Sequence, residues 1–138
     1  MNTKIYKSVH KLAENLLEAA QRNDNKQFNL LYSQLNKLCT DNENTNKDHP
    51  VQWETLADFT EELEDALVVY AKALEKSIAI DANDHMASIG FSMASLQIEL
   101  GQTEAAIKSL KNAKENASKI SDIELQQEIN ELLAGLTH

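Results

Sequence analysis

The sequence is short of the two residues that make most tight turns, with three glycines and one proline among 138 residues. An all-β domain needs many tight turns, and glycine and proline supply the backbone geometry for them. Their scarcity therefore excludes a domain built mainly of strands. The abundant residues are leucine, alanine, glutamate, lysine and glutamine, which favour helices most strongly. We expect an all-α fold in a single domain over residues 1–138, because this length fits one domain.

Cysteine and long hydrophobic runs are scarce as well. Cys39 is the only cysteine, so no internal disulfide bond can form, which fits a reducing compartment. It shares an apolar stripe with Leu35 and Leu38, so we expect a buried, unreactive thiol. The longest apolar run, residues 66–71, is far short of the roughly 20 residues that span a bilayer. The first residues lack the apolar run of a signal peptide, and we expect a cytoplasmic protein.

Positively charged residues are also scarce. The sequence contains 13 Lys and Arg and 22 Asp and Glu, which gives a formal net charge of −9. Nucleic-acid binding draws much of its affinity from Lys and Arg at phosphates, and anionic membranes attract basic segments. We therefore expect neither nucleic acid nor a membrane as a partner. The excess of acid favours encounters with basic partners.

The first 40 residues predict an antiparallel helical hairpin. Apolar residues recur at helical spacing over residues 3–22 and again over 26–40. Between them, residues 23–25 are Asn-Asp-Asn, whose side chains compete for the hydrogen bonds of a helix. A turn this short makes the two helices antiparallel.

A polar loop and a long helical pattern follow the hairpin. Residues 41–50 contain no apolar residue before Pro50, which suits the first turn of a new helix. Over residues 51–80 the apolar positions keep a three–four spacing without Gly or Pro. We favour one continuous helix over this segment. The alternative is a bend near Glu64 and Asp65, where acidic residues crowd.

Three shorter helices complete the chain. Residues 85–100 and 103–117 predict a second hairpin, joined at Gly101, which adopts a left-handed backbone at little cost. Residues 121–134 open with serine and have glutamate three positions later, the pattern of a capping box. They predict a last helix.

Small residues mark the positions where helices of the second hairpin cross. Around them, residues 74–118 resemble a tetratricopeptide (TPR) repeat. The matching positions are Ile89-Gly90 for the family's leucine-glycine pair, Met93 for its tyrosine, Gly101 at the turn, and Ala106, Leu110 and Ala113 in the second helix. The first helix of the unit is one turn longer than usual, and the closing proline of the family is missing.

The resemblance implies a right-handed superhelix of antiparallel hairpins, with two to three units and residues 121–134 as the capping helix. Residues 1–40 would supply the N-terminal hairpin, and residues 51–118 the long helix plus the TPR-like hairpin. The resemblance also implies a scaffold whose concave face binds a peptide or amphipathic helix of a partner protein. The family's groove positions fall on Ala87, Phe91, Ala94 and Ser95. The alternative is that Phe91 belongs to the core against the last helix.

An acidic stretch offers a second candidate surface. Six acids and no base occur in the twelve residues from Glu54 to Asp65. One interpretation is a face for a basic partner, made by Glu54, Asp58, Glu61, Glu62 and Asp65. The other is a solvated helix side with no partner, since surface acids are common and screened by salt.

No pattern of a catalytic site is visible. The four histidines lie on separate segments, and the sequence has neither a Glu-x-x-His motif nor a glycine-rich phosphate loop. We therefore expect a non-enzymatic adaptor with no catalytic residue, metal or cofactor. A self-associating bundle, such as a homodimer joined through residues 51–80, is the main alternative. A metal-dependent helical-bundle enzyme is a more distant one.

Overall fold

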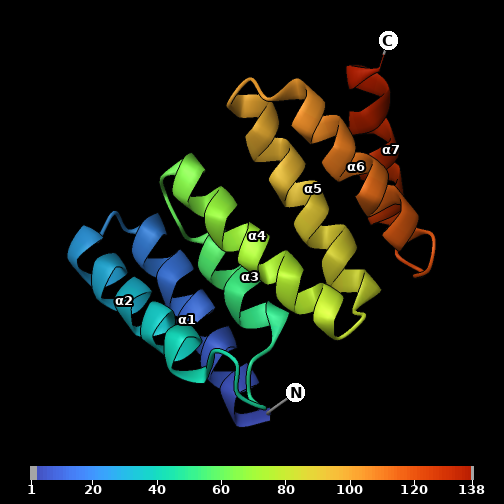
Figure 1. The fold of residues 1–138 in the computed structure, drawn as a ribbon. Coiled ribbons are helices and arrows are strands. Elements are labelled where there is room, and N and C mark those ends of the chain that lie inside the picture. The colour runs from blue at the N-terminus through green and yellow to red at the C-terminus, as the bar shows by residue number, and fades with distance from the viewer. Residues whose placement is uncertain (1–2, 138) are drawn as a thin grey trace.

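The computed structural model describes residues 3–137. Within this range the chain forms seven α-helices and no strand, which confirms the all-α prediction (Figure 1). The helices are α1 (Thr3–Gln21), α2 (Asn25–Asn42), α3 (Pro50–Asp58), α4 (Leu63–Ala79), α5 (Asn83–Glu99), α6 (Thr103–Ala117) and α7 (Ile123–Leu136).

The helices stack as antiparallel neighbours along the chain (Figure 1). The pairs α1–α2, α3–α4 and α5–α6 each pack together, α4 packs on α5, and α7 packs on α6. Helices of odd number also contact each other in order, α1 with α3, α3 with α5, and α5 with α7. Among the described residues no such contact joins α2 to α4 or α4 to α6. The odd-numbered helices therefore form one contiguous layer.

The helix predicted over residues 51–80 is interrupted, so the expectation of one continuous helix was wrong. The chain leaves helical geometry at residues 59–62, before Glu64 and Asp65, where a bend was the alternative. The hydroxyl of Thr60 donates to the carbonyl of Leu56 at 2.8 Å, while the phenol of Tyr32 lies 2.7 Å from the same hydroxyl. These bonds end α3 and fix the turn.

Packing explains why the break is favourable. Folding α4 back on α3 buries Trp53 and Leu56 together with Ala66 and Tyr70 in one core, which a straight helix could not bring together. The acidic residues Glu64 and Asp65 then stand in the first turn of α4, where the helix dipole favours negative charge.

The connection between α2 and α3 is shorter than the predicted loop of residues 41–50, because α2 continues to Asn42. Pro50 begins α3, as predicted, and the imidazole of His49 accepts a hydrogen bond from the amide of Val51 at 3.1 Å. Lys76 pairs with Asp48 at 2.9 Å, which ties the connection to α4.

The apolar residues gather in two clusters. The first spans helices α1 to α4 and includes Ile89 of α5. Cys39 lies fully buried in it, where burial and then the charges of Asp48 and Glu43 raise the pKa of the thiol to about 12. The second cluster joins α5, α6 and α7. There a Cβ added to Gly90 would lie 3.0 Å from the Cβ of Ala113. This confirms the predicted close approach of the two helices.

Candidate functional site

The charged residues are unevenly distributed among the helices. Helices α3, α5 and α7 contain seven acidic side chains and no Lys or Arg: Glu54 and Asp58 in α3, Asp84 and Glu99 in α5, and Glu124, Glu128 and Glu131 in α7. All 13 Lys and Arg residues lie in the other helices or in connecting segments. Because α3 contacts α5 and α5 contacts α7, the acids collect on adjacent helices. We call α3, α5 and α7 the acidic helices.

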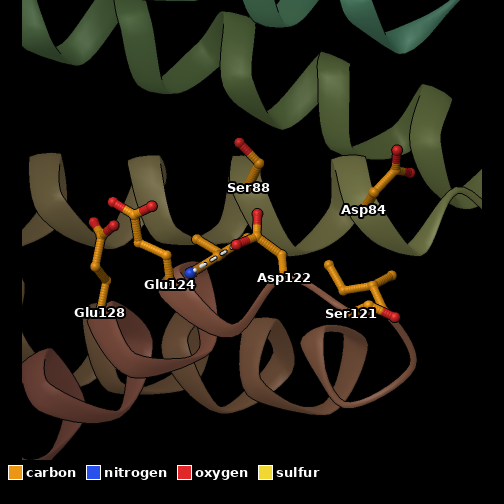
Figure 2. A pocket seen from close by; sticks show the side chains of 8 residues that line it. Asp84, Ser88, Ser121, Asp122, Glu124 and Glu128 are labelled. Carbon is orange, nitrogen blue, oxygen red and sulfur yellow. Dashed lines mark hydrogen bonds between the residues drawn. The ribbon is translucent and has the colours of Figure 1, made fainter.

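A pocket opens between α5 and the start of α7, with a volume of about 410 Å³. We call it the α5–α7 pocket. Figure 2 shows Asp84 and Ser88 extending from α5, with Glu124 and Glu128 on α7. Four carboxylates, two hydroxyls and two aliphatic side chains line it: Asp84, Asp122, Glu124, Glu128, Ser88, Ser121, Ile120 and Leu125. The lining includes no basic side chain.

The rim of this pocket is held by the start of α7. Asp122 is its N-cap, since its carboxylate accepts a hydrogen bond from the amide of Leu125 at 3.0 Å. The capping-box pattern thus indicated the start of the last helix correctly, but its serine, Ser121, is not the N-cap. The side-chain amide of Gln126 donates to the carbonyls of Ala117 and Ile120 at 2.8 and 3.0 Å, which fixes the α6–α7 turn.

Three of the pocket's carboxylates form no ion pair or hydrogen bond with another described residue. Asp84, Glu124 and Glu128 are exposed, and their side chains form neither an ion pair nor a hydrogen bond within residues 3–137. They are therefore available for a ligand of opposite charge.

Beside the pocket, Glu54 joins α3 to α5. Its carboxylate accepts a hydrogen bond from the Ser88 hydroxyl at 2.8 Å, and its other oxygen lies 3.1 Å from Nδ1 of His85. The hydrogen bond between Glu54 and His85 raises the pKa of His85, although burial opposes the shift. The side chain of Glu54 is only 15% exposed, so it links helices and is not free for a partner.

His49 adds a second ring to this junction. Its ring meets the ring of His85 edge-on, with 5.3 Å between the centroids. Burial lowers the pKa of His49, and the nearby charge of His85 lowers it further. The pKa of His85 is therefore shifted upward, and that of His49 downward, from the ordinary value of histidine.

Asp58 is an exposed residue whose carboxylate is likewise engaged within the chain. It accepts a hydrogen bond from the phenol of Tyr70 on α4. Although part of the residue remains exposed, withdrawal of its carboxyl group from water raises its pKa to about 6. The Tyr70 hydrogen bond opposes this rise, and the charge of Glu54 adds to it. The hydrogen bond thus helps to hold α3 against α4.

The predicted acidic face is therefore divided between two places. Glu54 and Asp58 make contacts between helices. Glu61, Glu62 and Asp65 are exposed around the α3–α4 turn. Of the five residues, Glu54 and Asp58 are thus engaged within the chain, and Glu61, Glu62 and Asp65 are not.

The predicted groove on α5 needs a larger correction. Ala87 and Ala94 are fully buried in the second apolar cluster and cannot contact a partner. Phe91 packs against that cluster, which includes Ile129 of the last helix, as the alternative interpretation held. The hydroxyl of Ser95 donates to the carbonyl of Phe91 at 3.1 Å. The small side chains serve the close packing of helices, so no groove is formed by these four residues.

The α5–α7 pocket was missed from the sequence, although one signal was present. No Lys or Arg occurs between Lys76 and Lys108, and none follows Lys119. Lys and Arg are thus absent from the whole of α5 and α7. Recognising a site there also required knowing that α7 packs near the start of α5.

Between residues 3 and 137, no group of three or more His, Cys, Asp or Glu side chains is placed to hold a metal ion. No helix in the same range is both long and apolar enough to cross a bilayer.

The chain was also compared with known proteins. No family model, curated protein or solved structure matches it. The resemblance to TPR repeats consequently stays a prediction.

Proposed function

We propose that the chain is a non-enzymatic, TPR-like scaffold of the cytoplasm that binds a basic segment of a partner protein on the acidic helices. The observation that carries the proposal is the distribution of charge. Three helices that contact one another in order contain seven carboxylates and no Lys or Arg. Glu54 and Asp58 are engaged within the chain, and the other five carboxylates are exposed. Such a one-signed surface steers a partner of opposite charge and disfavours partners of like charge.

The α5–α7 pocket supports this choice of partner. Ile120 and Leu125 supply apolar surface beside the free carboxylates of Asp84, Glu124 and Glu128. Lysine and arginine combine an aliphatic stem with a charged end, so they suit a pocket that offers both kinds of contact. A purely apolar peptide would remove these carboxylates from water without a compensating charge.

The arrangement of the helices is consistent with a repeat scaffold. Three antiparallel pairs followed by a last helix agree with the two to three units and the capping helix that the resemblance implies. In a stack of helical hairpins, one layer of helices supplies an extended binding surface. The contiguous odd-numbered helices are the natural candidate for that layer.

The test is affinity capture from the lysate of the native host with three baits. They are the wild type, an acid-to-amide triple variant of the pocket, and a control that neutralises three exposed acids elsewhere. The pocket variant is Asp84→Asn/Glu124→Gln/Glu128→Gln, and the control is Glu75→Gln/Glu104→Gln/Glu115→Gln. We expect a partner with a basic segment to be captured by the wild type and the control but not by the pocket variant. Equal capture by all three baits would contradict the proposal.

A second candidate function is self-association, which one observation favours. Val68 and Ile78 are 70% and 60% exposed on α4, near Ala71 on the same side of the helix. The exposed Glu75 lies on the same side between Val68 and Ile78, so a second copy would pair with a partly apolar face. Light scattering over a range of concentrations tests it, with Val68→Glu/Ile78→Glu as the variant. A dimer that this variant dissociates would support self-association, and a monomer at every concentration would exclude it.

A further inference from the structure

A second pocket, of about 360 Å³, lies between α2 and the α3–α4 turn. We call it the aromatic pocket. Figure 1 shows the α3–α4 turn at the end of the molecule opposite to the α6–α7 turn, which borders the α5–α7 pocket. The two pockets are therefore separate sites. Three aromatic and three acidic side chains stand in the lining of the aromatic pocket: Phe28, Tyr32, Phe59, Glu61, Glu62 and Asp65.

The aromatic side chains are held in place by the first apolar cluster. Phe28 and Tyr32 lie one helical turn apart on α2, and both pack against that cluster, as does Phe59. The rings of Phe28 and Phe59 are tilted, with centroids 6.4 Å apart. Because the Thr60 hydroxyl donates to Leu56, the phenol of Tyr32 donates to Thr60. The aromatic side of the pocket is thus formed before any ligand binds.

The acidic side of the pocket carries uncompensated charge. Glu61, Glu62 and Asp65 are exposed, and their side chains make no ion pair or hydrogen bond with any other described residue. The dipole of α4 accounts for acids near its first turn. It does not account for three aromatic rings in the lining of the same pocket.

This combination restricts the ligand. Negative groups are repelled, and a neutral apolar ligand would desolvate the carboxylates without a compensating contact. A metal ion does not fit either, because these acids are not grouped to coordinate one. An organic cation suits both kinds of lining residue, since aromatic rings attract cations and carboxylates accept charge-assisted hydrogen bonds.

We propose that the aromatic pocket binds an arginine side chain of a basic segment in a partner protein. The guanidinium group is planar, stacks on aromatic rings and donates two parallel hydrogen bonds to a carboxylate, whereas the lysine ammonium is a strongly hydrated point charge. This inference does not depend on the α5–α7 pocket, since the two sites share no residue.

The test is a titration of the ¹⁵N-labelled protein, followed by NMR, with the peptide acetyl-Gly-Arg-Gly-amide. We expect saturable shifts centred on the amides of Phe28, Tyr32 and Phe59, with a Kd in the millimolar range. The same peptide with citrulline in place of arginine keeps the shape but loses the charge. It should bind at least about tenfold more weakly.

Two variants locate the binding. The substitutions Glu61→Gln/Glu62→Gln/Asp65→Asn should weaken arginine binding at least about tenfold while the NMR spectrum stays that of a folded protein. The α5–α7 pocket variant Asp84→Asn/Glu124→Gln/Glu128→Gln should leave the shifts in the aromatic pocket unchanged. Loss of partner capture with that variant alone would therefore report on the proposed function and not on this site.

Several results would overturn the inference. They are the absence of saturable shifts, equal binding of the citrulline peptide, and arginine shifts that survive neutralisation of Glu61, Glu62 and Asp65. A lysine peptide that binds as tightly as the arginine peptide would also overturn the assignment to arginine.

Discussion

At the scale of single residues, Gly90 determines how closely α5 and α6 can approach. A Cβ at this position would lie 3.0 Å from the Cβ of Ala113 and 3.4 Å from the carbonyl oxygen of Ser109. Neither atom belongs to a flexible side chain that could turn aside. The helices would have to separate to accept even one methyl group.

Gly90→Ala should therefore lower the free energy of unfolding by about 1 kcal/mol, because overpacking outweighs the helix propensity of alanine. Gly135→Ala is the matched control, since no other described residue lies within 4 Å of the added methyl beyond its own helix and chain neighbours. The control should raise the free energy of unfolding by about 0.5–1 kcal/mol. Urea denaturation measures both changes. A stabilised Gly90→Ala protein would show that the contact with α6 is not tight.

The His85–Glu54 pair gives a prediction about pH. The hydrogen bond to Glu54 raises the pKa of His85 in the folded state. Its contribution to stability is then fully present below the unfolded pKa of about 6.5 and is lost as the pH rises through the folded pKa. We expect His85→Gln to destabilise the protein more at about pH 5.5 than at about pH 8.

Urea denaturation of wild type and His85→Gln at both pH values measures this difference. An NMR titration of the imidazoles gives an independent readout. The midpoint of His85 should lie above that of His49, whose pKa is lowered by burial, and Glu54→Gln should lower the midpoint of His85. An equal loss of stability at both pH values would show that the pair does not depend on the charge of His85.

Single residues also show where sequence reasoning stops. Alanines at helical spacing look the same whether they face a groove or another helix. Ala87 and Ala94 face the core, because the small residues of α5 let α6 pack closely against it. Local spacing carries no information about which neighbour covers a helix face.

At the scale of the helices, most boundaries could be predicted, because turn residues and apolar spacing are local signals. The hairpin of α1 and α2 and the turn at Gly101, with its φ of 75°, follow from such signals. The break between α3 and α4 does not follow from local signals of this kind, because neither Gly nor Pro marks it. It depends on Tyr32, 28 residues away from its partner Thr60. The acidic first turn of α4 was the only local indication.

The start of α7 yields a prediction at this scale. Asp122 caps the helix, whereas Ser121 makes no capping hydrogen bond among the described residues. Asp122→Ala should lower the free energy of unfolding by about 1 kcal/mol, and Ser121→Ala should change it by less than about 0.5 kcal/mol. Urea denaturation compares the two variants. The reverse order would restore Ser121 as the cap and shift the start of the helix.

At the scale of the whole molecule, the separation of charge is the main feature. Its sequence signal is the alternation of helices with and without Lys and Arg, which can be read from the chain. That α3, α5 and α7 lie in one layer cannot be read from it, because the layer results from contacts between distant segments. The net charge therefore favours a basic partner but does not identify a surface that would bind one.

The most direct test of the proposed function is the affinity of the captured partner's basic segment, measured by calorimetry at about 50 and about 300 mM salt. The pocket variant Asp84→Asn/Glu124→Gln/Glu128→Gln should bind at least about tenfold more weakly than the wild type at low salt, and the control Glu75→Gln/Glu104→Gln/Glu115→Gln within about threefold of it. Added salt should weaken wild-type binding most. Equal affinities for the three proteins, or affinities unaffected by salt, would contradict the binding of a basic partner by the acidic helices.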